Sequence, residues 1–432
     1  MTDTPRVDDY CADLGDFITA SPTSYHAAEE AARRLDDAGF ARQRAGDPWN
    51  VSPGGHVLVR DGALMAWVVP EGAGTHSAFR IVGTHTDSPT FKLKPEPAIS
   101  RSGWQSVGVE VYGGPLQNSW LDRDLGLAGR VIDREGAVHL VQTGAICRIP
   151  QLAIHLDRSI SSEGLKLDAQ QHTAPIYAVG DPDADILAIV AQAAGLTPDA
   201  ITGHDLYLFD TQRPEVIGAN ADLFASARLD NLSSTHAGLQ ALLDYEAQAE
   251  DTDILVLAAF DHEEVGSGTR TGAGGPLLEE ILTRTATALG ADLEQRAQMW
   301  SRSALLSCDA GHAIHPNYPE RHDPDTRPLL NAGPLLKLNA QQRYASDARG
   351  TAIWNRACAA AEIDHQVFVS NNAMPCGSTI GPISATRLGL VTVDVGVPLL
   401  SMHSARELAG VHDLPALSAA ISAFFTIPLG LS

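Results

Sequence analysis

The stretch Ile254–Gly268, ILVLAAFDHEEVGSG, joins an uncharged apolar run to a cluster of ionisable side chains. The run of seven apolar residues, 254–260, is typical of a parallel strand that is buried on both faces. Four ionisable residues follow at once: Asp261, His262, Glu263 and Glu264. Carboxylates this close together raise one another's pKa unless a cation compensates their charge. The stretch therefore predicts a buried strand that runs into a metal-binding loop, with a solvated acidic turn as the alternative.

The chain has 432 residues, a length that favours two domains over one. Its hydrophobic content of 44% is enough for a large core. With 53 acidic and 30 basic residues, the formal charge of -23 argues against nucleic acid and against an anionic membrane surface as partners. We expect a soluble, acidic enzyme.

The sequence also bears on the cellular compartment. No apolar run approaches the roughly 18 residues of a membrane-spanning helix, and residues 1–17 lack the basic start and apolar core of a signal peptide. The five cysteines are scattered without CxxC spacing, so neither a disulfide framework nor a thiolate zinc site is indicated. We expect a cytoplasmic protein.

The pattern along the chain predicts an α/β protein with an insertion. Two helices are expected within residues 8–40, and alternating strands and helices occupy most of 226–432, which indicates a mixed, mainly parallel sheet covered by helices on both faces. Residues 96–225 contain short β-type runs separated by Gly and Pro, with one helix near 185–194. The sequence thus predicts a discontinuous catalytic domain, 1–95 and 226–432, interrupted by a β-rich domain at 96–225.

Polar clusters stand at or just beyond five of the apolar segments. They are His85 with Asp87, Asp230 with Asn231, Glu263 with Glu264, Asp309, and His403. Because loops at the carboxyl ends of parallel strands converge on one crevice, we expect these side chains to meet. Imidazole and carboxylate ligands suit zinc, manganese or cobalt better than calcium. Each cluster taken singly also fits an ordinary loop or core residue, and only their joint placement indicates a site.

The ligand count fits two divalent metal ions that share one carboxylate. We assign His85 and Asp309 to one ion and Glu264 and His403 to the other, with Asp230 as the bridge.

Two carboxylates remain beside these ligands. Glu263 is expected to act as the general base, which takes a proton from the attacking water and passes it to the leaving amine. Asp87 is expected to accept the ring N–H of His85 and so fix its tautomer.

Six motifs then identify a family resemblance. In chain order they are GTHTDSP, ARLDNL, DHEEVGS, DAGHAIHPNYPE, GPLLKLNAQQRYASD and MHSARE. Together they resemble the aspartyl aminopeptidase family of co-catalytic zinc metallopeptidases, over nearly the whole chain. The resemblance implies a phosphorylase/hydrolase-like catalytic domain interrupted by a β-rich dimerisation domain. It also implies removal of N-terminal Asp or Glu from peptides, and a tetrahedral dodecamer whose active sites face an internal chamber.

The resemblance also bears on individual residues. The family's ligand roles fall on the residues assigned above, His85, Asp230, Glu264, Asp309 and His403, and its base on Glu263. A substrate with an acidic side chain needs a cation in its pocket, and Lys337 is the best candidate because a lysine within the apolar run GPLLKLN is unfavourable unless a partner uses it. A lysine that extends to solvent is the alternative.

His155, in PQLAIHLDR, resembles the family histidine that reaches a neighbouring subunit's active site, although a packed histidine fits the sequence as well. Gln151 stands where relatives often carry His or Asn, and that position is not a ligand. His312 and His315 are expected to be loop residues rather than further ligands. Cys376, in a glycine-rich turn, is a candidate for the pocket lining, and nothing marks it as a nucleophile.

Two other readings stay open at this point. The same site would serve a neutral-residue aminopeptidase, or a related dimetal deacylase or carboxypeptidase. A catalytically inactive oligomeric scaffold is the alternative outside enzymes.

Overall fold

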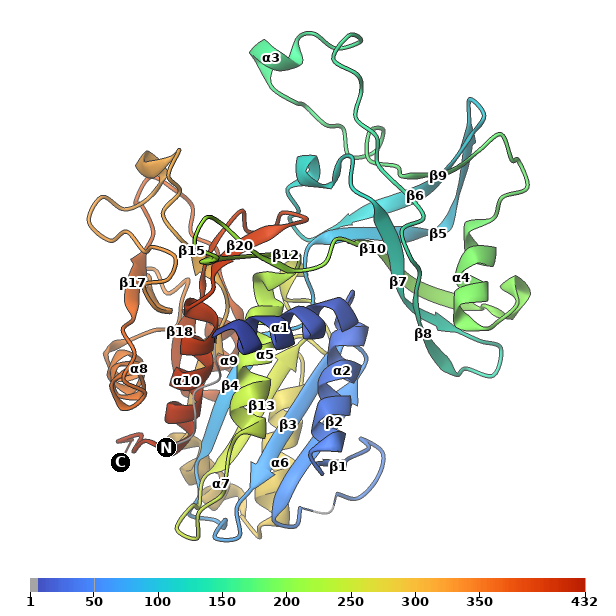
Figure 1. Cartoon of the computed structure of the whole chain (residues 1–432). Helices are drawn as coiled ribbons and strands as arrows, with labels where there is room; N and C mark the ends of the chain where they lie inside the picture. The colour runs from blue at the N-terminus through green and yellow to red at the C-terminus, as the bar shows by residue number, and fades with distance from the viewer. Residues whose placement is uncertain (1–6, 50, 432) are drawn as a thin grey trace.

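The structure of the protein, a computed structural model, describes residues 7–49 and 51–431 (Figure 1). Its largest sheet has nine strands. In chain order these are β1 Ala41–Arg42, β2 Gly54–Arg60, β3 Ala63–Val69, β4 Phe79–His85, β13 Ile254–Phe260, β14 Ala304–Cys308, β16 Leu335–Leu338, β17 Gln366–Val369 and β18 Val391–Gly396. Their spatial order is β1-β2-β3-β13-β4-β14-β18-β16-β17.

The centre of this sheet is parallel. Strand β4 pairs in parallel with β13 on one side and with β14 on the other, and β14 pairs in parallel with β18. Antiparallel pairs join β3 to β13 and β16 to β18. The strands β4, β13 and β14 are buried along their whole length. This arrangement confirms the predicted mixed, mainly parallel sheet, and it brings the carboxyl ends of these strands to one edge.

Helices cover both faces of the sheet (Figure 1). One face packs against α1 Val7–Ala20, α2 Ser24–Asp37, α5 Leu229–Leu243, α8 Ala348–Ala360 and α10 Asp413–Thr426. The other face packs against α6 Leu277–Ala288, α7 Leu293–Ser301 and α9 Ile380–Leu388. Each face has its own buried hydrophobic cluster.

Helices α7, α9 and α10 were not predicted from the sequence. A capping box between Asp292 and Gln295 begins α7, and the side chain of Thr379 accepts a hydrogen bond from the Gly381 N–H at the start of α9. Such caps satisfy N–H groups that have no partner inside the helix.

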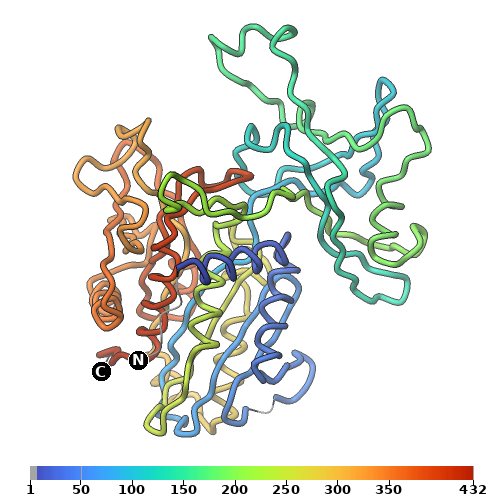
Figure 2. Tube along the Cα trace, viewed as in Figure 1, coloured from blue at the N-terminus to red at the C-terminus, as the bar shows by residue number. Residues whose placement is uncertain are grey.

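A second sheet stands beside the nine-stranded body. Its strands are β5 Thr90–Arg101, β6 Trp104–Tyr112, β7 Leu125–Ile132, β8 Val138–Gln142, β9 Ile176–Val179 and β10 Gly203–Asp210, in the spatial order β8-β7-β10-β5-β6-β9. Figure 2 shows the chain leaving the body along β5 and returning along β10. The sheet and the helix α4 Ile186–Ala194 share a separate hydrophobic core.

Strand β10 was not predicted, and β5 begins at Thr90, before the domain limit expected at residue 96. The division into 1–95 with 226–432 and 96–225 stays a prediction. Residues 1–6, 50 and 432 of those ranges lie outside the described residues.

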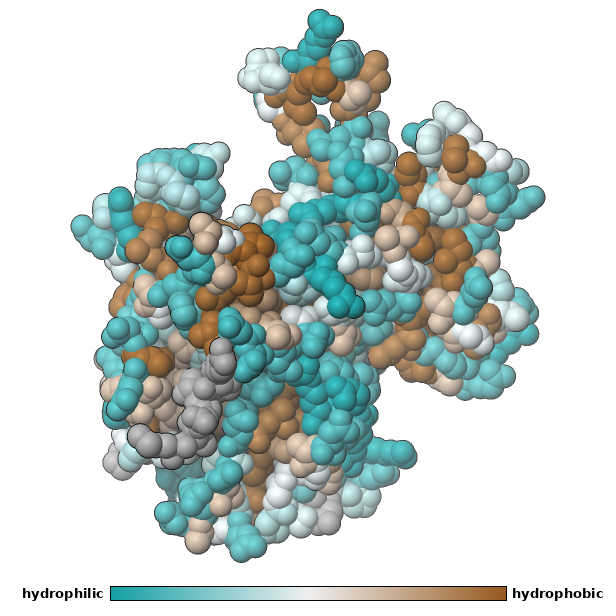
Figure 3. Space-filling view, viewed as in Figure 1, coloured by the Kyte–Doolittle hydropathy of each residue, from teal (hydrophilic) through white to brown (hydrophobic). Residues whose placement is uncertain are grey.

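A long arm joins β8 to β9 and carries the short helix α3 Ile160–Glu163. It projects from the six-stranded sheet, and Figure 3 shows hydrophobic groups on its surface. The exposed apolar side chains of the arm are Leu152, Ile154, Leu156 and Leu165.

A third sheet has five strands: β11 Glu215–Ile217, β12 Leu223–Ser226, β15 Gly311–His312, β19 Pro398–Leu400 and β20 Glu407–Gly410. Their order is β11-β12-β20-β19-β15. Strands β19 and β20 follow β18 in the chain and form an antiparallel pair. The turn between them contains His403.

None of the described helices is both long and apolar enough to cross a membrane.

Candidate metal centre

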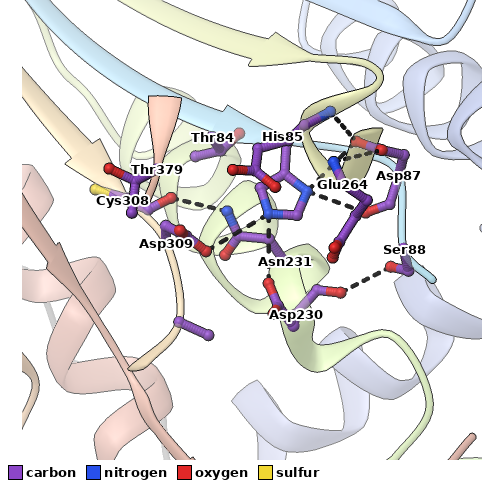
Figure 4. A network of polar contacts seen from close by, with 12 residues as sticks. Thr84, His85, Asp87, Ser88, Asp230, Asn231, Glu264, Cys308, Asp309 and Thr379 are labelled. Carbon is purple, nitrogen blue, oxygen red and sulfur yellow. Dashed lines mark hydrogen bonds and ion pairs between the residues drawn. The ribbon is translucent and has the colours of Figure 1, made fainter. Parts of the chain in front are cut away.

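The predicted ligand residues meet at the carboxyl edge of the nine-stranded sheet. Figure 4 shows four of them there, His85, Asp230, Glu264 and Asp309. His85 ends β4, and Asp309 follows β14, the neighbouring strand. Glu263 and Glu264 lie in the 3-10 helix η3 Glu263–Val265 that follows β13, the strand on the other side of β4. The parallel pairing of three strands thus gathers side chains that are far apart in sequence.

The other two predicted ligands come from outside these strands. Asp230 lies at the start of α5, where its backbone is not helical, and is 4% exposed. His403 lies in the β19–β20 turn with a left-handed backbone, φ 66°. Both side chains point toward the cluster.

The carboxylate of Asp230 faces both histidines. Its Oδ1 lies 3.3 Å from Nε2 of His85, and its Oδ2 lies 3.4 Å from Nε2 of His403. Nε2 of His85 is also 3.5 Å from Oδ1 of Asp309, and Nε2 of His403 is 3.4 Å from Oε2 of Glu264. Two groups of donor atoms therefore share one carboxylate.

These separations suit zinc ligands better than direct hydrogen bonds. Ligand atoms at about 2.0–2.1 Å from a tetrahedral zinc ion are about 3.3–3.4 Å apart, whereas N–H···O hydrogen bonds cluster at about 2.9–3.0 Å. In addition, Oδ1 of Asp230 and Oε1 of Glu264 are buried without a hydrogen-bond partner among the described residues. Buried oxygens of this kind are normally satisfied, so the donor set fits divalent cations.

The electrostatics of the cluster point the same way. Burial raises the pKa of Glu264 well above its usual value, and the negative charge of Asp230 acts in the same direction. Burial raises the pKa of Glu263 to about 7, and the neighbouring carboxylates Asp309 and Asp87 act in the same direction. Burial opposes protonation of His85, but its contacts with Asp230 and Asp309 raise its pKa. The buried carboxylates thus lack compensating positive charge, which bound cations would supply.

Both site histidines are held by main-chain carbonyl groups. Nδ1 of His85 donates to the carbonyl oxygen of Asp87 at 3.0 Å, and Nδ1 of His403 donates to that of Gly114 at 3.0 Å. A carbonyl oxygen only accepts hydrogen bonds, so each Nδ1 carries the proton. Each Nε2 is therefore left as an electron-pair donor that faces the cluster.

Asp87 is the predicted partner of His85, but its carboxylate lies farther away than its carbonyl, with Oδ1 3.5 Å from Nδ1. The carboxylate instead accepts the main-chain N–H groups of Glu263 at 3.0 Å and Glu264 at 3.1 Å. The hydroxyl of Tyr112 donates to it at 2.8 Å. Asp87 thus ties the loop after β4 to the loop after β13.

Sequence reasoning missed Tyr112 and Glu407. Glu407 is 2% exposed, and it accepts the N–H of Asp230 at 2.9 Å and the N–H of His403 at 2.7 Å. A charged residue beside an apolar run is unfavourable without a partner, which was the argument for Lys337. The same argument could have indicated Glu407, which precedes the apolar residues Leu408 and Ala409. Tyr112 gave no comparable signal, since tyrosine is ordinary in a strand.

Lys337 is 1% exposed on β16 and lies beside the cluster. Its ammonium group donates to the carbonyl oxygen of Ala310 at 3.0 Å and is 3.5 Å from Oδ2 of Asp309. It also lies 5.0 Å from the ring centroid of Tyr344. The structure therefore excludes the alternative of a lysine that extends to solvent.

The remaining predicted residues lie apart from the cluster. His155 is exposed on the arm between β8 and β9. Among the described residues, it belongs to none of the groups that could hold a metal ion. His312, on β15, contacts the ring of Phe368, and Nδ1 of His315 accepts the N–H of Asn317. Neither belongs to a described group that could hold an ion. Cys376 packs beside Tyr344 and Phe368.

Asn231 is buried, and its side-chain amide donates to the carbonyl oxygen of Cys308 at 2.8 Å. It thereby joins the start of α5 to the end of β14, next to Asp309.

A set of histidines and carboxylates that could hold divalent ions, at the carboxyl edge of a mixed sheet, is typical of α/β metalloenzymes. The model of the Aminopeptidase I zinc metalloprotease (M18) family matches residues 17–425. The chain belongs to this family, which confirms the family resemblance read from the six motifs and makes the chain a metal-dependent aminopeptidase.

Relatives support this assignment over the whole chain. A probable M18 family aminopeptidase 2 from Streptomyces coelicolor is 51% identical over 416 residues, covering 95% of this chain and 96% of the relative. A protein of the same name from Mycobacterium leprae is 43% identical over 425 residues, covering 97% and 99%.

Solved structures agree with the fold. Ape4, in a cryo-EM structure of its complex with Nbr1, is 33% identical with a TM-score of 0.93, covering 97% of this chain and 86% of Ape4. The mApe1 dodecamer of S. cerevisiae is 29% identical with a TM-score of 0.85, covering 98% of each chain.

Proposed function

We propose that this M18 aminopeptidase removes N-terminal aspartate and glutamate from peptides. The observation that carries the proposal is the buried ammonium group of Lys337, 3.5 Å from Oδ2 of Asp309. A positive charge at the edge of the cluster would attract the acidic side chain of a substrate's N-terminal residue. The scissile amide bond of that residue would then lie over the donor atoms. The low dielectric of a buried position strengthens this attraction.

We assign two divalent ions, most simply zinc, to the cluster. His85 and Asp309 would hold one ion, Glu264 and His403 would hold the other, and Asp230 would be the shared ligand. When bound, such ions polarise the scissile carbonyl and lower the pKa of a bound water. Manganese and cobalt suit the same ligands, and availability decides between them.

Glu263 manages the proton in this proposal. Glu263 lies beside the proposed ligands His85 and Glu264, where its carboxylate can accept a proton and release it again. It takes a proton from the attacking water as oxygen bonds to the carbonyl carbon. It then delivers that proton to the amine nitrogen as the C–N bond breaks. Asp87 keeps Glu263 in place because its carboxylate accepts the Glu263 N–H.

His155 is proposed to act in the active site of a neighbouring subunit. It lies on a projecting arm with exposed apolar side chains, which is a suitable surface for contact with another copy. Self-association as dimers that build a tetrahedral dodecamer fits this role, and the S. cerevisiae relative mApe1 is a dodecamer.

We also propose a cytoplasmic location. All five cysteines are free, as expected in a reducing compartment.

A substrate panel tests the specificity. Peptides that differ only in the first residue, Asp, Glu or Leu, are compared with N-acetyl-Asp peptide by kcat/KM. We expect Asp and Glu peptides to be cleaved fastest and the acetylated peptide to resist, because an aminopeptidase requires a free amine. Faster cleavage of Leu than of Asp would support a neutral-residue aminopeptidase, and cleavage of the acetylated peptide would support a deacylase.

A further inference from the structure

The end of β6, in the six-stranded sheet, and the residues that follow it lie against the candidate metal site of the nine-stranded sheet. The hydroxyl of Tyr112, the last residue of β6, donates to Oδ2 of Asp87 at 2.8 Å. Two residues later, the carbonyl oxygen of Gly114 accepts Nδ1–H of His403 at 3.0 Å. The N–H of Leu116 then donates to the carbonyl oxygen of His403 at 2.9 Å. One short segment therefore contacts two separate parts of the cluster.

Gly113 lies between these two contacts and faces a third site residue. Its φ of +69° is a conformation that favours glycine, and a Cβ atom built there would lie 3.1 Å from Cβ of Glu264. A separation of this size is tighter than ordinary van der Waals contact. A side chain at residue 113 would therefore displace either the segment or Glu264.

We propose that Tyr112, Gly113 and Gly114 form a positioning segment, through which the six-stranded sheet orients both histidines of the metal site. The inference rests on the metal roles proposed above. Under this inference, the geometry of the metal site also depends on the six-stranded sheet, although that sheet supplies none of the proposed ligands.

The segment acts on each histidine by a different route. At His403 the contact is direct, because the Gly114 carbonyl fixes the ring so that Nε2 faces Asp230 and Glu264. At His85 it is indirect. The hydroxyl of Tyr112 donates a hydrogen bond to the carboxylate of Asp87. The main-chain carbonyl of Asp87 in turn accepts the Nδ1–H of His85.

Contacts of this kind set the orientation and basicity of metal-binding histidines. Removing an outer hydrogen bond to a ligand typically lowers metal affinity or activity by roughly 10- to 100-fold. Tyr112 is therefore expected to influence metal binding without being a ligand itself.

The chain offers matched controls for both positions. Tyr207 is another buried tyrosine of the same sheet, with its ring centroid 5.5 Å from that of Tyr112, and its side chain interacts with Tyr25 and Lys92. Gly136 has a φ of +82°, like Gly113, but nothing lies within 4 Å of its built Cβ. Tyr207→Phe thus removes a neighbouring hydroxyl that is not bonded to Asp87, and Gly136→Ala adds a methyl group where nothing lies close.

The test measures zinc affinity by competition with a chromophoric chelator, and ligand geometry from the visible absorption of Co²⁺ bound to the same proteins. We expect Tyr112→Phe and Gly113→Ala each to weaken zinc binding by roughly 10- to 100-fold and to alter the Co²⁺ spectrum. Tyr207→Phe and Gly136→Ala should match the wild type in both. A general effect on folding would not change the Co²⁺ spectrum of the folded fraction.

Wild-type affinity and spectrum in both Tyr112→Phe and Gly113→Ala would overturn the inference and leave the proposed function intact. Equal losses in the variants and their controls would also overturn it. Wild-type protein that binds neither zinc nor Co²⁺ would contradict the proposed metal roles themselves, and this inference with them.

Discussion

The carboxylate of Glu407 accepts the main-chain N–H of Asp230 at 2.9 Å and, through its other oxygen, the N–H of His403 at 2.7 Å. One buried side chain thereby sets the relative position of the start of α5 and the β19–β20 turn. Neither element is a neighbour of β4 in the nine-stranded sheet. The positions of the metal-donor atoms of Asp230 and His403 therefore depend on the hydrogen bonds to Glu407.

Glu407→Gln should lower the free energy of unfolding by about 1–3 kcal/mol, because an amide NH₂ would face one of two main-chain N–H groups and leave it unsatisfied. Chemical denaturation measures the change. Glu215→Gln is the control. Glu215 is an exposed residue of the five-stranded sheet that also contains Glu407, and its carboxylate lies 3.7 Å from the guanidinium group of Arg406. Exposed ion pairs contribute about 0–1 kcal/mol. Equal stability of the two variants would contradict the structural role of Glu407.

Glu263→Gln should retain metal and lose roughly 10²- to 10⁴-fold in kcat, because the amide cannot accept the proton of the attacking water. Metal content is determined on the same sample as kcat. Near-normal turnover with full metal content would show that another group acts as the base.

Lys337→Met should reduce kcat/KM for Asp and Glu peptides far more than for Leu peptides. Methionine keeps much of the length of the buried side chain but removes the ammonium group that would pair with an acidic substrate. Because Lys337 also contacts Asp309, metal content is measured alongside the kinetics. An equal loss on all peptides would remove Lys337 from the specificity role.

His155→Ala and Glu263→Gln should complement each other when the two chains are assembled into mixed oligomers. Some sites would then combine an intact Glu263 with an intact His155 from a neighbouring chain. Mixing Glu263→Gln with Lys337→Met is the control, because both changes lie at the same chain's cluster and no site regains both residues. Failure of the first mixture to exceed its separate components would contradict a shared site.

Removal of metal should destabilise the wild-type protein. Zinc that binds the folded chain and not the unfolded chain contributes about 2.7 kcal/mol when its concentration is one hundred times Kd. We therefore expect Tm to fall on dialysis against a chelator and to recover on addition of zinc. Asp230→Ala, which removes the carboxylate facing both histidines, should show no such recovery, and full recovery in that variant would exclude Asp230 as a shared ligand.

The sequence predicted the centre of the sheet because its strands are mainly apolar runs that end at polar residues. In β4, β13 and β14 every residue is buried, so no alternation hides the pattern. The parallel order of these strands then explains why His85, Glu264 and Asp309 lie together. Asp230 and His403 were found from their polar clusters, although neither follows a strand of this sheet.

Two of the missed helices, α9 and α10, have residues in their first turn that usually end helices. Helix α9 has Gly381 and Pro382 in its first turn, and α10 has Pro415 there. Proline is tolerated in the first turn because its missing N–H would have no partner inside the helix. The pattern alone does not separate such a start from a loop.

The missed site residues depend on how separate sheets dock. Tyr112 and Gly114 reach the cluster because the end of β6 lies against the loops of another sheet. No local pattern in β6 indicates which side chain lies at that junction. Contacts between sheets are set by the packing of the whole chain, so they were found only in the structure.

Anomalous diffraction at the zinc absorption edge, on crystals of the protein prepared with zinc, tests the central claim most directly. We predict two peaks, one beside His85 and Asp309 and the other beside His403 and Glu264, with the carboxylate of Asp230 between them. No peak at this cluster, or a single peak that Asp230 does not contact, would contradict the shared metal site.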